Sequence, residues 1–90
     1  MKRGVRLIVQ YSGEIYFKHN VNDPKHMDKI IERKLHKRQV GSGFLLRGEL
    51  NKEGLRDISF HYQSSDEAYK AAKIIKKMKG VRLTEIEPVN

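Results

Sequence analysis

The strongest constraint on the fold is the order in which strand-like and helix-like patterns alternate along only 90 residues. Runs of β-branched and aromatic residues are typical of strands, and apolar residues at three- and four-residue spacing are typical of helices. The two patterns follow one another in the order strand, helix, strand, strand, helix, strand. A chain of this length suits one domain with a modest core, so we expect residues 1–90 to form a single unit.

The clearest helix signal covers residues 64–78. Ser64 and Glu67 form a capping box, a pairing that satisfies backbone N–H groups at the start of a helix. Gly80 stands where such a helix would end. The expected buried stripe comprises Ala68, Ala71, Ala72, Ile75 and Met78. Its small alanines would let the helix lie close to a sheet.

A first helix is expected to start near Asp23, a good N-cap that is followed by Pro24 at the first helical position. Gly41 is expected to be the left-handed residue just after this helix. Its expected buried stripe comprises Met27, Ile30, Ile31 and Leu35.

Four strands are expected, at 5–11, 44–50, 55–62 and 81–87, with Pro88 ending the last one. The side chains expected to face inward are Val5, Leu7, Val9 and Tyr11, then Phe44, Leu46 and Leu50, then Ile58, Phe60 and Tyr62, and finally Val81 and Leu83. Residues 12–18 leave two interpretations open, a first strand that continues past a bulge or a short hairpin.

This order of elements predicts an α+β fold. It closes naturally as a ferredoxin-like sandwich, with a four-stranded antiparallel sheet and two helices on one face.

Charge is the main indication of function. The chain has 19 basic and 11 acidic residues, a net charge of +8 and an isoelectric point near 9.9. Such a charge is typical of proteins that bind RNA or DNA, although acidic lipid or an acidic protein would be attracted equally. The lack of cysteine favours a reducing compartment such as the cytoplasm. The apolar run near the N-terminus is too short for a secretion signal or a membrane span, so no membrane partner is expected.

The basic residues fall on two predicted surfaces. The outer faces of the two helices carry Lys25, Lys29, Arg33, Lys70, Lys73 and Lys77. The sheet face that no helix covers would carry Arg6, Arg47 and Arg82, together with Thr84 and the apolar Ile8 and Leu45. Either surface would follow a phosphate backbone.

No catalytic, metal or cofactor motif stands out. The four histidines lack the converging spacing of a metal site. The stretch Gly41-Ser42-Gly43 follows a predicted helix, whereas phosphate loops precede one, so it indicates helix termination. We therefore expect no enzyme activity, no cofactor and no metal.

Part of the chain resembles an RNA-recognition motif. The resemblance rests on Arg56–Tyr62, on Asp66-Glu67-Ala68 with Ala71-Ala72, and on Met78-Lys79-Gly80. It implies RNA binding through aromatic rings exposed on the two central strands. Here Ile8, Asp57 and Ser59 occupy those positions, and Phe60 and Tyr62 are expected in the core.

Two functions follow from these features. The first is a non-enzymatic nucleic-acid-binding domain, with RNA favoured over DNA by the resemblance. The alternative is a protein-interaction module that uses the uncovered sheet face, either to form a homodimer or to act as a small inhibitor or adaptor of the kind that viruses and mobile elements encode. An arginine-lined face would favour nucleic acid, and a dry apolar face would favour a protein partner.

Overall fold

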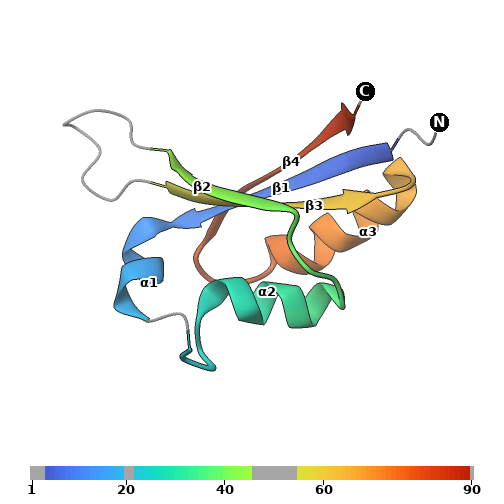
Figure 1. Cartoon of the computed structure of the whole chain (residues 1–90). Coiled ribbons are helices and arrows are strands. Elements are labelled where there is room, and N and C mark those ends of the chain that lie inside the picture. The colour runs from blue at the N-terminus through green and yellow to red at the C-terminus, as the bar shows by residue number, and fades with distance from the viewer. Residues whose placement is uncertain (1–3, 20–21, 46–54, 90) are drawn as a thin grey trace.

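The computed structural model describes residues 4–19, 22–45 and 55–89 (Figure 1). These residues form a four-stranded antiparallel sheet and three helices, which confirms the predicted α+β class. The elements are β1 (Gly4–Ser12), α1 (Gly13–Lys18), α2 (Met27–Leu35), β2 (Gly41–Leu45), β3 (Leu55–Tyr62), α3 (Ser65–Lys76) and β4 (Val81–Val89). None of the helices in this described part is long and apolar enough to cross a membrane.

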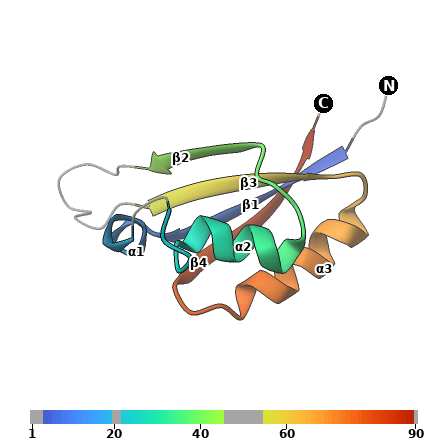
Figure 2. The same cartoon turned by 60° about the horizontal axis from the view of Figure 1, so that its bottom comes forward.

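The strands lie in the order β2-β3-β1-β4, and every neighbouring pair is antiparallel. It follows that β1 and β2 run parallel on either side of β3, and that β3 and β4 run parallel on either side of β1. Each of the two helical connections therefore crosses one intervening strand. Both views show α2 and α3 side by side on the same face of the sheet (Figures 1 and 2).

The core lies between this face and the two long helices. Its fully buried large side chains are Leu7, Val9, Tyr11, Ile31, Ile58, Phe60 and Ile75. The predicted inward positions of β1 and β3 are confirmed, including Phe60 and Tyr62. Ser64 is the N-cap of α3, as predicted, because its hydroxyl accepts a hydrogen bond of 3.3 Å from the Glu67 backbone N–H and donates one of 3.4 Å to the Glu67 carboxylate. Ala68, Ala71 and Ala72 are buried on α3, as expected.

The predicted limits of the first helix are wrong at both ends. The N-cap is His26, whose Nδ1 accepts the Asp28 backbone N–H, and not Asp23. The Asp23 carboxylate instead accepts the Lys25 backbone N–H at 2.8 Å and so closes a turn before the helix. At the other end the left-handed residue is His36, with φ of 52°. Gly41 already belongs to β2, and most of the strand expected at 44–50 lies outside the described residues.

Both interpretations of residues 12–18 are wrong, because Gly13–Lys18 is a short helix. Ile15 and Tyr16 have side chains typical of strands, yet both pack against the core. Tertiary packing here outweighs the local β propensity.

A bulge changes the side-chain parity of β4. The β1–β4 register shifts between Gln10, which pairs with Leu83, and Tyr11, which pairs with Val81. Leu83 is therefore 48% exposed and not inward as predicted, whereas Thr84 pairs with the buried Val9 and not with the uncovered face. The strand also continues through Pro88, which an edge strand tolerates because its outer N–H groups have no partner strand.

The register defines the sheet face turned away from the helices, called the open face below. Directly paired residues share a face. Its described members include Arg6, Ile8, Gln10, Leu55, Asp57, Ser59, His61, Leu83, Glu85 and Glu87.

Gly80 provides a test of the packing between α1 and the turn before β4. Its φ is 100°, and an added Cβ would lie 2.5 Å from Cδ1 of Ile15. We expect Gly80→Ala to lower the free energy of unfolding by about 1–3 kcal/mol, measured by urea denaturation. Gly43→Ala is the control, because its Cβ would meet Asp57 at an ordinary 3.6 Å. Equal destabilisation of the two variants would contradict this description of the turn.

Candidate functional site

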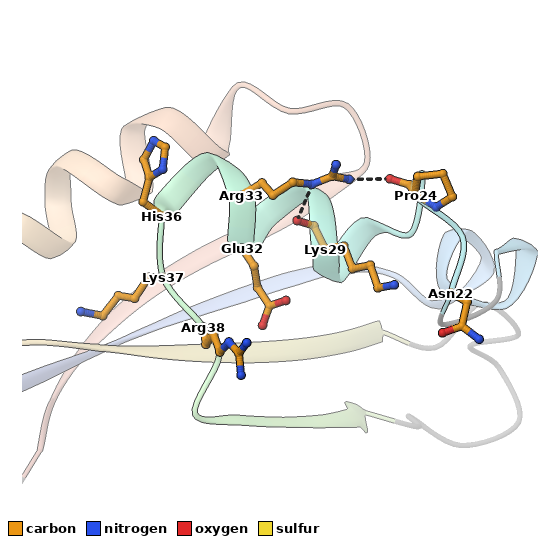
Figure 3. A pocket seen from close by; sticks show the side chains of 8 residues that line it. All are labelled: Asn22, Pro24, Lys29, Glu32, Arg33, His36, Lys37 and Arg38. Carbon is orange, nitrogen blue, oxygen red and sulfur yellow. Dashed lines mark hydrogen bonds between the residues drawn. The ribbon is translucent and has the colours of Figure 1, made fainter.

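A basic groove runs along the outer side of α2 (Figure 3). It is an open hollow of about 910 Å³. Its lining residues are Asn22, Pro24, Lys29, Glu32, Arg33, His36, Lys37 and Arg38. Four of them are permanent cations and one is a carboxylate, so this surface, called the α2 groove below, favours anions.

The sequence builds the groove in two steps. Lys29, Arg33 and His36 recur at helical spacing on the side of α2 away from the buried Ile31. The chain then turns at the left-handed His36, and the Lys37 backbone N–H bonds back to the Glu32 carbonyl at 3.1 Å. This turn brings Arg38 to the Glu32 side of the groove, whereas Lys37 points away from the helix, with its ammonium 4.5 Å from the centroid of the Tyr62 ring (Figure 3).

Arg33 is held in position at this surface. Its Nη2 donates to the Pro24 carbonyl at 2.6 Å, and its Nε donates to the Lys29 carbonyl at 3.4 Å (Figure 3). These bonds use two of the five N–H donors of a guanidinium. A guanidinium that is already positioned loses less conformational freedom when it binds a phosphate.

A buried ion pair lies beneath α2. Arg56 of β3 donates to both carboxylate oxygens of Asp28, with a closest distance of 2.7 Å from Nη2 to Oδ2. The Tyr11 hydroxyl and the Gln39 side-chain amide also donate to Asp28. The Arg56 guanidinium lies over the Tyr16 ring, 4.2 Å from its centroid. Asp28 thus joins α2 to β1, β3 and the segment after the helix.

The protonation states in this cluster follow from its contacts. Burial opposes ionisation of Asp28, but hydrogen bonds from Arg56 and Tyr11 and the charge of Arg56 outweigh it, so the pKa of the carboxyl is lowered. Burial also opposes the charge on Arg56, but the bond to Asp28 holds the guanidinium pKa above its ordinary value. Burial, reinforced by Asp28, raises the pKa of Tyr11. At neutral pH the cluster is a complete ion pair with a neutral tyrosine.

A second hollow of about 220 Å³, called the inner hollow below, adjoins the α2 groove. The two share Lys29 and Glu32. The inner hollow is lined by Tyr16, His26, Asp28, Lys29, Glu32, Gln39 and Arg56. His26 is 3% exposed, and its Nε2 has no hydrogen-bond partner among the described residues.

The predicted helix residues do not all meet in one place. Lys29 and Arg33 line the α2 groove, whereas Lys25 lies exposed in the turn before the helix. Lys70 and Lys73 are exposed on α3, and Lys77 is exposed directly after its end. Lys73 lines a separate hollow between α3 and β4 that includes Tyr69, Lys76 and Glu85. The structure therefore divides the helix lysines between two surfaces.

The open face differs from the expected positive surface. Arg6 forms an ion pair of 3.2 Å with Glu87. The bulge brings Glu85 and Glu87 onto this face in place of Thr84, and it leaves Arg82 exposed at the irregularity itself. Arg47 lies outside the described residues, and so does the side chain of Leu45. Ile8 is half-buried on this face.

In comparisons with protein-family models, curated proteins and solved structures, nothing matches this chain. Within the described ranges, no group of three or more His, Asp or Glu side chains gathers in a way that would hold a metal ion. The geometry of the hollows and their charge are therefore the main indications of function.

The Asp28 cluster makes a prediction for stability. Asp28→Asn leaves the Arg56 charge buried without its partner, so we expect a loss of about 3–5 kcal/mol in the free energy of unfolding at neutral pH. The double variant Asp28→Asn/Arg56→Met removes that charge and is expected to be more stable than the single variant. Urea denaturation of both proteins measures the difference. A single variant as stable as the parent would contradict the role of the pair.

The same cluster predicts the response to acid. The native pKa of Asp28 is below its unfolded value of about 3.9. Its contribution to stability is therefore complete above the unfolded pKa and is lost as the pH falls through the lower native pKa. The parent protein should lose stability over this range by more than Asp28→Asn does. Identical pH profiles would contradict the lowered pKa.

Proposed function

We propose that this chain is a small, non-enzymatic nucleic-acid-binding domain whose α2 groove holds backbone phosphates. The observation that supports this proposal most directly is the grouping of four cations in one open hollow, one of which, Arg33, is fixed by two backbone carbonyls. Arginine forks suit phosphate oxygens, and each cation that neutralises a phosphate releases a counterion. The net charge of +8 would attract the nucleic acid from a distance.

We propose further that the fold is ferredoxin-like, with α1 as an added helix. The strand order and the two crossing helical connections support this proposal. The resemblance to RNA-recognition motifs favours RNA over DNA as an associational argument. The described open face carries no Phe, Tyr or Trp, so base stacking on the sheet is not part of the proposal. The lack of cysteine supports a cytoplasmic location.

The test is a fluorescence anisotropy titration of labelled single- and double-stranded RNA and DNA at several salt concentrations. The groove variant is Lys29→Glu/Arg33→Glu/Arg38→Glu, and its matched control is Lys70→Glu/Lys73→Glu/Lys77→Glu, which changes the net charge equally on α3. We expect the groove variant to bind more weakly, with a salt dependence that is shallower by about 0.7–0.9 for each phosphate that the variant no longer neutralises. The α3 variant should keep the slope of the parent.

Three outcomes separate the interpretations of that titration. Equal losses in both triple variants would mean that only net charge matters and would reject the groove as the site. A selective loss in the α3 variant would move the site to the lysines of that helix. Binding by the parent that is no tighter than that of an unrelated protein of equal charge would reject the function.

The alternative is a protein-interaction module that acts through the open face. The observation in its favour is Leu83, which is 48% exposed on the same face as Ile8. The Arg6–Glu87 pair and the carboxylates Asp57 and Glu85 provide a mixed polar rim around these two side chains. A second copy of the chain would find both apolar area and charge complementarity there. Absence of nucleic-acid binding would leave this alternative as the next candidate.

A further inference from the structure

The α2 groove and the inner hollow are neighbours, because Lys29 and Glu32 line both. The volume of the inner hollow, about 220 Å³, is comparable with that of a single nucleobase. A strand held by its phosphates in the groove would therefore have a base-sized recess directly beside it.

Two side chains that line the inner hollow provide hydrogen-bond acceptors. The Gln39 side-chain nitrogen donates to Asp28 at 3.3 Å, which leaves the Gln39 side-chain oxygen as an acceptor. The Glu32 carboxylate accepts the Gln39 backbone N–H at 3.1 Å, a bond that orients it. A carboxylate accepts hydrogen bonds and donates none. The matching ligand is therefore rich in N–H donors on one edge.

His26 carries a buried donor in the wall of the inner hollow. His26 Nδ1 accepts the Asp28 backbone N–H, so a neutral ring carries its hydrogen on Nε2. That Nε2 is buried and has no partner among the described residues, which is costly unless a ligand or water supplies an acceptor. Arg56 and Tyr16 also line the hollow, and the Arg56 guanidinium lies over the Tyr16 ring.

We propose that the inner hollow binds one unpaired base of the strand in the α2 groove, and that it prefers guanine. This inference rests on the proposed function. The Watson–Crick edge of guanine presents two neighbouring N–H donors, which suit the Glu32 carboxylate, and a carbonyl oxygen on the same edge. Adenine and cytosine present an acceptor nitrogen where guanine has a donor, and uracil has one donor between two acceptors. A base inside a duplex cannot enter the recess, so single strands are preferred.

The opposing interpretation is that the chain binds only the phosphates of the strand. Glu32 would then be a negative charge that weakens the attraction of the positive groove. The two interpretations predict opposite results for Glu32→Gln. Under the phosphate-only interpretation, removing the charge strengthens binding of every strand by the same factor. Under the base-site interpretation, the variant loses its preference for guanine, because a glutamine amide cannot accept from both N–H groups.

The experiment uses single-stranded oligouridine of about 12 nucleotides and versions of it with one central guanine, adenine or cytosine. Anisotropy gives the dissociation constants of the full chain, of Glu32→Gln and of the control Glu85→Gln, which removes the same charge from the open face. We expect the parent and Glu85→Gln to bind the guanine strand about five-fold or more tightly than the others. Glu32→Gln should bind all four strands alike.

Failure of this inference differs from failure of the proposed function. If the parent binds none of the strands, the proposed function is wrong and the base site is rejected as well. If the parent binds all four strands and a matching duplex equally, and Glu32→Gln binds all of them more tightly by one factor, the base site is rejected while the phosphate groove stands.

Discussion

The buried ion pair between Asp28 and Arg56 is the interaction on which the placement of α2 depends. Taking two charges out of water is costly, and the cost is offset only when the geometry is good and the remaining hydrogen-bonding groups are satisfied. Here the carboxylate accepts from Arg56, Tyr11 and Gln39, which belong to β3, β1 and the segment before β2. In a chain with a modest core, such a cluster fixes one helix against two central strands.

The candidate site is built on the same helix. The inner side of α2 carries Asp28, and its outer side carries Lys29 and Arg33, so the ion pair also sets the position of the groove relative to the sheet. The turn at His36 completes the candidate site, because it reverses the direction of the chain and brings the Gln39 N–H to the Glu32 carboxylate. Residues that stabilise the fold and residues proposed to bind a ligand therefore lie next to one another in one short segment.

Local patterns predicted the parts of the fold that depend on local chemistry. The Ser64 cap, the alanine stripe and the inward positions of β1 and β3 each follow from residues close together in sequence. The bulge opposite Gln10 could not be predicted, because it depends on how two strands pair. It places the Leu83 side chain on the open face of the sheet and not in the core. The helix at Gly13–Lys18 depends on tertiary packing in the same way.

The candidate site was predictable in part. Helical spacing alone identified Lys29 and Arg33. Lys37 and Arg38 join them only because a histidine, and not the glycine at position 41, adopts the left-handed turn. The sequence does indicate that Arg56 is buried, because it shares the inward parity of Ile58 and Phe60. A buried charge requires a partner. Its partner, Asp28, lies 28 residues earlier in the chain and cannot be inferred from spacing.

We propose that nucleic acid binds along α2 and not on the open face of the sheet. The most direct test is a heteronuclear NMR titration of the ¹⁵N-labelled chain with a single-stranded RNA. We expect the amide shifts of α2 and of the segment from Lys37 to Gln39 to move, while those of Ile8, Ser59 and Glu85 stay in place. Shifts concentrated on the open face, with α2 unchanged, would contradict it.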